Sequence, residues 1–342
     1  MSVSICDKDY EWREFLGNVG SHDFTHSFDF HRISMARGEG EPLAFVAQDD
    51  GGAPVAMWPV LKRGIDNGNL FDFTSVYGYA GPLVAAGADS RAALAEILDA
   101  MRRYGAVSLF SRMHPLFSDR LDSDFRGTAL GDVVVIDVGT DPNVVNSYRG
   151  SHRREIVNAR AKGVAVSVES GASAVADFHA IYTQAMSKLD AEDYYFFDQD
   201  YLGRIAESSD FKALFLFATY EGKKIAASMF IVTGTIMQYY LSGTISEFRH
   251  LVPSKVIIAE AHARAMKMGV TQIILGGGVG SRRDALFAFK KGFSPQLFPF
   301  HVVRHIFDEE CYSALCAARG VSREGVHFFP AYRTVIQEVD AC

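Results

Sequence analysis

The chain has 342 residues, enough for about two domains of ordinary size. Its 48% hydrophobic and 22% charged residues are typical of an ordinary globular protein. The net charge of −7 argues against a protein that binds nucleic acid over its whole surface, although it leaves room for a local basic patch.

No membrane span and no signal peptide are predicted. The sequence contains no run of about 18 apolar residues, and acidic residues stand near the N-terminus where a signal peptide has its apolar core. The four cysteines, Cys6, Cys311, Cys316 and Cys342, lack the spacing of metal ligands and are predicted to be reduced thiols. We therefore expect a cytoplasmic protein, and the sequence leaves its oligomeric state open.

The first half of the chain begins with a predicted β-hairpin. Apolar residues 44–48 lead through an Asp-Asp-Gly-Gly turn into residues 54–60. A helix is predicted over 90–103, where apolar residues recur at helical spacing and Ser90 is placed as the N-cap. A glycine and a buried strand, 106–110, follow this helix.

Two helices are predicted in the middle of the chain. The first begins at Asp141-Pro142, with the aspartate as cap and the proline at the first helical position, and ends at Gly163. The second begins near Ser173 and has one apolar face.

The second half repeats the layout of the first. Residues 214–220 and 223–232 form a second predicted hairpin across a Glu-Gly turn. A helix over 254–268, with Ser254 as its cap, is followed by a glycine and a buried strand, 270–275.

The repeat is too long for a solenoid unit and indicates two copies of one domain. We therefore predict an α+β (mixed α/β) fold with domains over 1–140 and 141–342. Two similar domains make a cleft between them, and a cleft is the usual place for a ligand.

A glycine-rich segment, Gly276-Gly277-Gly278, follows the last of these strands. Glycine lets a ligand approach the backbone closely, but the segment also fits a flexible turn, and both interpretations stay open. A dinucleotide-binding fingerprint is not expected, because Arg283 stands where its third glycine belongs. A Walker A loop is not expected either, since no Gly-Lys-Ser/Thr follows.

Two groups of basic residues are candidates for charge stabilisation. Lys290 lies between phenylalanines, where a desolvated lysine can offset developing negative charge, although composition alone favours a surface lysine beside core aromatics. Arg153 and Arg154 belong to a basic stretch, 148–162, whose partner would be a phosphate or diphosphate unless it is a solvated helix face.

Aromatic pairs are candidates for lining a cleft. Tyr77 and Tyr79 are predicted to share one face of a strand, whereas Tyr239 and Tyr240 point to opposite faces. One tyrosine of each pair is expected in the core and the other in a cleft, with its hydroxyl free to form hydrogen bonds. No metal site and no nucleophile elbow are predicted.

Four passages, in this order along the chain, resemble Fem-type (FemA/FemB/FemX-like) proteins of the GNAT superfamily. The first, Arg153-Arg154-Glu155-Ile156 through Gly163-Val164, resembles their "RR-x-I-x-x-A-x-x-x-G-V" passage. The others are Leu251-Val252-Pro253-Ser254-Lys255, Leu275-Gly276-Gly277-Gly278 and Phe289-Lys290-Lys291-Gly292-Phe293. The resemblance implies two tandem GNAT-like (acyl-CoA N-acyltransferase-like) domains, in agreement with the repeat.

The resemblance implies an acyltransferase that acts on an amine. Fem ligases move an aminoacyl group from aminoacyl-tRNA to an amine of a peptidoglycan precursor, in cell-wall synthesis. Phe289 and Lys290 match the family's Phe-Lys pair, whose lysine is thought to stabilise charge at the reacting ester. The same likeness makes Ser254, Lys255 and the glycine-rich segment candidates for substrate binding, with Arg153 and Arg154 holding phosphate.

The usual GNAT coenzyme A motif, Arg/Gln-x-x-Gly-x-Gly/Ala, is not where the resemblance would place it. Residues 249–254, at the expected place, lack the glycines of the motif. Residues 160–165 match its sequence, but they run from a predicted helix into a predicted strand, whereas the motif lies between a strand and a helix. No tightly bound cofactor is expected, and the donor is aminoacyl-tRNA or acyl-CoA.

The hypothesis is therefore an acyltransferase that moves an aminoacyl or acyl group to a primary amine of a peptidoglycan-precursor or nucleotide-sugar-like acceptor. One alternative is an acyl-CoA-dependent N-acyltransferase of an amino sugar or small metabolite in surface-polysaccharide synthesis. Another is a non-catalytic binding protein on the same fold.

Overall fold

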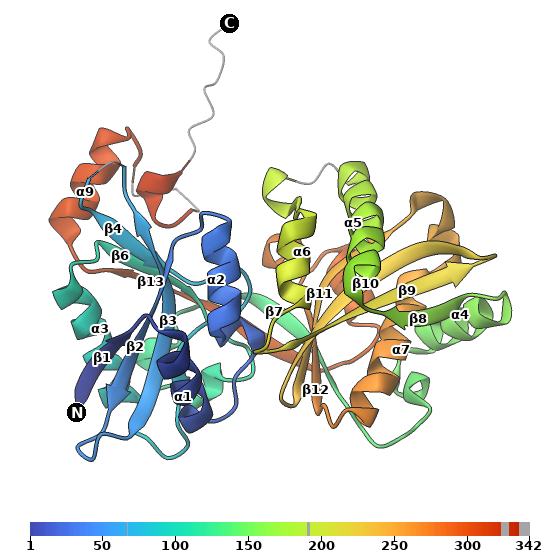
Figure 1. Cartoon of the computed structure of the whole chain (residues 1–342), viewed down its shortest axis with the longest axis horizontal. Coiled ribbons are helices and arrows are strands. Elements are labelled where there is room, and N and C mark those ends of the chain that lie inside the picture. The colour runs from blue at the N-terminus through green and yellow to red at the C-terminus, as the bar shows by residue number, and fades with distance from the viewer. Residues whose placement is uncertain (67, 190–191, 323–327, 335–342) are drawn as a thin grey trace, which may run out of the picture. The chain divides into compact units, whose positions relative to one another are not determined.

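The computed structural model describes residues 1–66, 68–189, 192–322 and 328–334 (Figure 1). The chain forms two compact units. The first unit comprises Met1–Ser21, Ser34–Ala129 and the described residues from Phe300 onward, and the second comprises His22–Ile33 and Leu130–Pro299. A single boundary near residue 140 therefore does not separate the units, because the chain returns to the first unit after Pro299.

The first unit contains one sheet with strand order β1-β2-β3-β4-β6-β13, and β5 pairs with β3. Neighbours are antiparallel except β4 and β6, which are parallel. Its elements are β1 (Ser2–Cys6), α1 (Asp9–Val19), β2 (Glu41–Gln48), β3 (Pro54–Gly64), β4 (Phe71–Thr74), β5 (Leu83–Val84), α3 (Ser90–Tyr104), β6 (Ser108–Arg112), the paired part of β13 (Leu297–Ile306) and α9 (Glu309–Ala318), with 3-10 turns at Ser118–Arg120, Ser123–Phe125 and Ala331–Arg333.

The second unit repeats this arrangement with strand order β8-β9-β10-β11-β12-β7. Again only one pair of neighbours, β11 and β12, is parallel. Its elements are β7 (Thr128–Asp137), α4 (Gly150–Ala161), β8 (Ala165–Glu169), α5 (Gly171–Lys188), α6 (Gln199–Ala206), β9 (Lys212–Tyr220), β10 (Lys223–Thr233), β11 (Ile236–Thr244), α7 (Pro253–Lys267), β12 (Gln272–Gly276) and α8 (Ala285–Lys290), with 3-10 turns at Phe24–His26, Val144–Ser147, Asp193–Tyr195, Ser246–Leu251 and Val279–Ser281; helix α2 (Phe28–Ala36) begins in this unit.

The two units have the same order of elements, as predicted from the repeat, but the last strand of each sheet comes from the other half of the chain. Strand β7 follows the first copy in sequence and pairs with β12 of the second unit. Strand β13 follows the second copy and pairs with β6 of the first unit. Sequence periodicity does not reveal this exchange, because a strand's pattern shows which face is buried and not which neighbour it pairs with.

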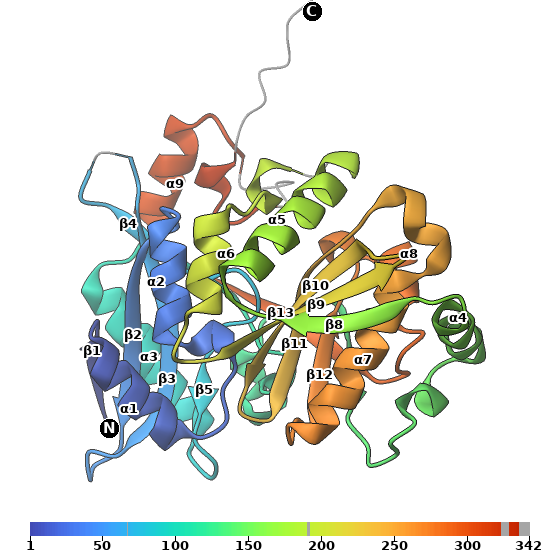
Figure 2. The ribbon, with the colours of Figure 1, turned by 45° about the vertical axis from the view of Figure 1, so that its right-hand side comes forward.

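Helices cover both faces of the sheet in the second unit, where α5 and α7 can be followed in Figure 2. Leu214 and Leu216 of β9 belong to the core cluster that contains α7. Phe215, between them, packs edge-on against Phe178 of α5 at 5.4 Å. Because successive strand residues face opposite sides, burial on both faces explains why these strands are apolar without alternation.

Both predicted hairpins are confirmed, since β2 pairs with β3 and β9 pairs with β10. The predicted cap of α3 is wrong: Asp89, rather than Ser90, accepts the cap hydrogen bond, from the amide of Ala92. The hydroxyl of Ser90 instead accepts from the amide of Asp122 at 3.0 Å. A short polar side chain can accept a hydrogen bond from any backbone amide that the tertiary structure brings near it.

The helix predicted from Asp141-Pro142 begins later. Residues Val144–Ser147 form a 3-10 turn, and α4 starts only at Gly150. The carboxylate of Asp141 accepts from the amide of Asn143 and from the side chain of Asn146, at 2.8 and 3.1 Å. Asp141 therefore organises a turn rather than a helix N-terminus.

Candidate active site

A cavity of about 370 Å³ opens in the second unit where β11 ends and α7 begins, among elements that can be followed in Figure 2. Its walls come from the end of α5, the end of β11, the turn before α7, the first turn of α7, and α8. The residues are Ala185, Met186, Leu189, Ser242, Gly243, Thr244, Arg249, Val252, Pro253, Ser254, Lys255 and Phe289.

Gly243 lets the backbone of α5 come close to β11 at this cavity. A Cβ on Gly243 would lie 2.9 Å from the carbonyl oxygen of Ile181 and 3.0 Å from the Cα of Tyr182. Any larger residue would push the helix away from the strand.

The first turn of α7 offers few amide donors to a ligand. Val252 has a left-handed backbone with φ 47° and Pro253 occupies the first helical turn. Proline has no amide hydrogen, and the amide of Lys255 is already bonded to the carbonyl of Val252 at 3.0 Å. The predicted cap is also wrong, because Ser254 follows Val252 and its hydroxyl is hydrogen-bonded to that of Thr244 at 2.8 Å.

Lys255 is held by two side chains of α4. Its ammonium group forms an ion pair with Glu155 and lies 3.3 Å from Nδ1 of His152. The hydrogen bond from Lys255 lowers the pKa of Glu155. These contacts use two of the three ammonium hydrogens and leave one for a ligand in the cavity.

His152 is buried and its tautomer follows from its partners. Nε2 lies 2.9 Å from the carbonyl oxygen of Phe289, which can only accept, so the hydrogen is assigned to Nε2. Nδ1 is then free to accept from Lys255, and burial lowers the pKa of His152, which favours this neutral form. Gly292 makes the arrangement possible, because a Cβ there would overlap the imidazole ring.

Lys290 lies at the end of α8 and is buried, with 9% of its surface exposed. Its ammonium group donates to the carbonyl oxygen of Gly277 at 2.7 Å. Burial lowers the pKa of Lys290 to about 8. Lys290 does not line the cavity, whereas Phe289 before it does.

The glycine-rich segment after β12 is a structured turn. Gly276 has φ 83°, a conformation that favours glycine. A Cβ on Gly277 would lie 2.9 Å from the carbonyl oxygen of Asp132, and one on Gly278 would overlap Arg282 and Asp284. The carboxylate of Asp284 accepts from the amides of Val279 and Phe287, at 3.0 and 2.9 Å, and so closes the turn and caps α8.

The remaining predicted site residues lie away from the cavity. Arg153 and Arg154 are exposed on α4. Tyr239 packs against Phe230 and donates to the hydroxyl of Ser242 at 2.6 Å. None of these three side chains is part of the cavity wall.

Tyr77 and Tyr79 belong to the first unit and do not lie on a strand, because β4 ends at Thr74. The prediction that they share a strand face is therefore wrong. Tyr79 packs edge-on against Phe300 at 5.2 Å, and burial raises the pKa of its hydroxyl. Gly78 between them has φ 110°, which accounts for the bend.

The sequence prediction missed the roles of His152 and Glu155. Their spacing of three places both on one side of a helix, but two basic neighbours made the stretch resemble a phosphate site. Among the described residues, no group of three or more His, Cys, Asp or Glu could hold a metal ion, and no helix is long and apolar enough to cross a membrane. Cys6, Cys311 and Cys316 form no disulfide among the described residues, and Cys342 lies outside them.

Comparison with known proteins places the cavity within a recognised domain. Residues 146–291 match the family described as Acetyltransferase (GNAT) domain. No curated protein sequence matches the chain. Every residue of the cavity wall, together with His152, Glu155 and Lys290, falls inside the matched range.

The fold is similar to two solved structures. FemX aligns with a TM-score of 0.70 and 13% identity, over 92% of this chain and 99% of FemX. L-PGS from Bacillus licheniformis aligns with a TM-score of 0.57 and 13% identity, over 93% of this chain and 98% of L-PGS. The predicted α+β fold with two similar GNAT-type units is thereby confirmed. Residues 146–291 are therefore an acetyltransferase (GNAT) domain, carried by a chain that has the fold of FemX.

Proposed function

We propose that this GNAT-family acyltransferase moves an acyl or aminoacyl group to a primary amine, with the reacting carbonyl in the cavity between β11 and α7. The observation that carries the proposal is the position of Lys255, which lines this cavity and has one ammonium hydrogen left for a ligand. Aminolysis of an ester or thioester passes through an oxyanion, which such a donor stabilises.

Lys290 is proposed as a second source of positive charge near the reaction. It lies next to Phe289 of the cavity wall, and its ammonium group is desolvated. A positive charge in a site of low dielectric interacts more strongly with a developing oxyanion than the same charge in water does. Arg153 and Arg154, exposed on α4, are proposed to hold phosphate groups of a donor or acceptor that extends beyond the cavity.

The donor we favour is aminoacyl-tRNA, and the acceptor a peptidoglycan-precursor or nucleotide-sugar-like amine. Support comes from the first turn of α7, where Pro253 has no amide hydrogen and the amides of Val252 and Lys255 are already bonded to carbonyl oxygens. Coenzyme A would bind this turn weakly, because a pyrophosphate needs several amide donors. The resemblance of four passages to Fem-type proteins suggests this class of reaction, and the fold shared with FemX agrees with it.

The second candidate is an acyl-CoA-dependent N-acyltransferase of an amino sugar or small metabolite. The match of residues 146–291 to an acetyltransferase domain favours it. A binding protein without activity on the same fold is the third candidate. Buried Lys290 argues against it, because a protein without chemistry gains nothing from the cost of desolvating this charge.

The experiment compares the two donors with candidate amine acceptors. The full chain is incubated with radiolabelled acetyl-CoA or with a labelled mixed aminoacyl-tRNA pool, and transfer to each amine is measured. Transfer from aminoacyl-tRNA alone supports the favoured donor, and transfer from acetyl-CoA alone contradicts it. No transfer from either donor, together with no shift of melting temperature by either, indicates the binding protein.

The variant Lys255→Met tests the role of the cavity lysine. We expect transfer to fall by about 100-fold or more, the usual cost of removing an oxyanion donor. The control is Lys267→Met at the exposed end of the same helix, which should keep full activity. Full activity of a folded Lys255→Met protein would remove the basis of the proposal.

A further inference from the structure

A second cavity, of about 520 Å³, lies in the first unit. Three basic side chains line it: Lys62 and Arg63 near the end of β3, and Arg333 in the last described turn. Glu41 is the one acidic residue in its wall among the residues described there. The chain as a whole carries a net charge of −7, so a basic cavity is unlike its average surface.

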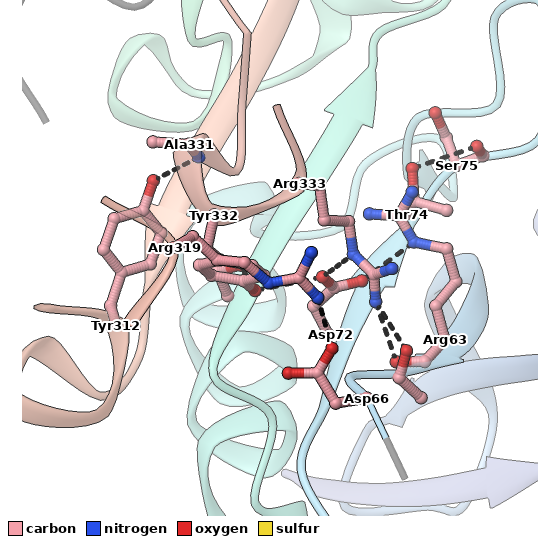
Figure 3. A network of polar contacts seen from close by, with 12 residues as sticks. Arg63, Asp66, Asp72, Thr74, Ser75, Tyr312, Arg319, Ala331, Tyr332 and Arg333 are labelled. Carbon is pink, nitrogen blue, oxygen red and sulfur yellow. Dashed lines mark hydrogen bonds and ion pairs between the residues drawn. The ribbon is translucent and has the colours of Figure 1, made fainter. Parts of the chain in front are cut away.

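One buried carboxylate holds both arginines, as Figure 3 shows. Asp72 is fully buried and accepts from Nε of Arg63 at 2.8 Å and from Nε of Arg333 at 2.6 Å. It also accepts from the hydroxyl of Tyr332 at 3.0 Å. Two guanidinium groups on one carboxylate leave one positive charge uncompensated at this point.

The hydrogen bonds to Asp72 use the Nε atoms, so the Nη atoms of both arginines are not bonded to this carboxylate. Nη2 of Arg333 donates to the carbonyl oxygens of Gly64 and Arg63, at 2.8 and 3.3 Å. Within the described part of the chain, three guanidinium nitrogens have no hydrogen-bond acceptor. They are the two Nη atoms of Arg63 and Nη1 of Arg333. Burial lowers the pKa of Arg63, which reports the same desolvation of its charge.

Lys62 adds a third positive charge without a carboxylate partner among the described residues. Its ammonium group lies 4.5 Å from the ring centre of Phe71 and 5.3 Å from that of Tyr104. Gly40 packs closely against β3, because a Cβ there would lie 2.8 Å from the carbonyl oxygen of Lys62 and 3.0 Å from Cγ of Arg63. Three cationic side chains therefore gather in one cavity, whose wall also includes Gly40.

Two other arginines show a different pattern. Arg204 pairs with Asp200, and Arg319 pairs with Asp66 beside this cavity, one carboxylate to each. Partly burying a cation without a neighbouring acid lowers the stability of the fold, and a bound anion offsets this cost. Among the described residues, the carboxylate of Asp72 therefore compensates only one of the two guanidinium charges beside it.

We propose that this cavity binds the phosphate group of a small phosphorylated ligand. Guanidinium forks match phosphate oxygens in pairs, and a neighbouring ammonium adds charge without demanding a particular geometry. Phe71 in the wall offers an apolar surface for the organic part of a phosphate ester. The cations form one cluster inside a cavity, whereas a polynucleotide would need a basic stripe across the surface.

The proposal does not depend on the function proposed for the second unit. The wall residues that carry it lie in the first unit, outside residues 146–291. Binding and acyl transfer are measured separately, so either proposal can fail alone.

The test is calorimetric titration of the full chain with pyrophosphate and with ADP, at constant ionic strength set with chloride. We expect saturable binding of one or both probes and a rise in melting temperature. Binding of ADP but not pyrophosphate identifies an ester with an organic part, and the reverse identifies inorganic pyrophosphate. No saturable binding of either would overturn the proposal.

Two variants and a control locate the site. Lys62→Gln removes a charge that makes no hydrogen bond to any described residue, and we expect it to weaken binding by about 10-fold, equal to about 1.4 kcal/mol. Arg333→Gln should weaken it further, with folding checked by circular dichroism. Arg319→Gln, which breaks the neighbouring pair with Asp66, should bind within about 2-fold of the original chain.

Two results of these titrations would contradict the assignment. One is binding that Lys62→Gln and Arg333→Gln leave unchanged, since the anion would then lie elsewhere. The other is tighter binding of a short single-stranded RNA than of either probe, with the same dependence on Lys62 and Arg333, which would indicate a polynucleotide partner.

Discussion

At the scale of single residues, two lysines of the second unit are in opposite situations. Lys255 lines the cavity with its charge compensated by Glu155, while Lys290 is buried against a carbonyl oxygen. Burial disfavours the charged form of Lys290 and lowers its pKa to about 8. Burying a charged group lowers the stability of the fold, so a buried lysine is expected at a position where function requires its charge.

Replacing Lys290 should separate activity from stability. The pKa difference from 10.5 to about 8 corresponds to about 3 kcal/mol, which the loss of the bond to Gly277 partly offsets. We expect Lys290→Met to keep its stability or gain about 1 kcal/mol in urea unfolding, and to lose transfer by about 100-fold. Lys291→Met, at the exposed neighbouring position, is the control for both measurements. Full transfer activity of folded Lys290→Met would show that its charge is not used.

The same lysine predicts a pH dependence of stability. Between pH about 8 and 10.5 the unfolded chain binds the proton that folded Lys290 has lost, so the free energy of unfolding should rise with pH across this window. Transfer that depends on the charged form should fall as pH rises through about 8. Urea unfolding at about pH 7 and about pH 10, compared between the original chain and Lys290→Met, measures this contribution, which the variant should lack.

At the scale of elements, the cavity depends on close approaches between helices and turns. Gly243 brings α5 close to β11, and Gly292 makes room for the His152 ring beside Phe289. Through His152, α4 helps to hold Lys255 of α7 in place. Glycines at such contacts act by having no side chain, not by flexibility.

Gly292→Ala should therefore displace His152. We expect a loss of about 1–3 kcal/mol in the free energy of unfolding, as for other overpacked sites, and a lower transfer rate because Lys255 loses one acceptor. The matched control is Gly150→Ala at the start of α4, where a Cβ meets open space. This variant should gain up to about 1 kcal/mol, because alanine restricts the unfolded chain. Equal stabilities of the two variants would contradict the steric explanation.

At the scale of the whole molecule, neither half of the sequence contains a complete sheet. Strand β7 belongs to the first half of the chain and pairs with β12, and β13 belongs to the second half and pairs with β6. The segment His22–Ile33 also joins the second unit, where Asp23 is hydrogen-bonded to Gln238. The two units are therefore completed by segments that cross from one half to the other.

A fragment cut at the predicted boundary should not fold. Residues 141–342 lack β7, so the edge of β12 would lose its partner, and the described part of β13 would have no sheet to join. We expect this fragment to be aggregated or to lack a cooperative thermal transition by circular dichroism, whereas the full chain unfolds cooperatively. Co-expression with residues 1–140 should restore a soluble complex. Cooperative folding of 141–342 alone would contradict the strand exchange.

The sequence by itself determined the local elements and the repeat. Hairpins 44–60 and 214–232 and the helices near 90 and 254 follow from periodicity and turn residues, which are local properties of the chain. Glycines and a resemblance pointed to the segment around Phe289 and Lys290, and the GNAT match includes it. Only the tertiary structure decided which side chains meet: His152 with Lys255, Asp72 with Arg63 and Arg333, and β7 with β12. These pairs are distant along the chain, and no period or cap encodes a partner that only packing brings near.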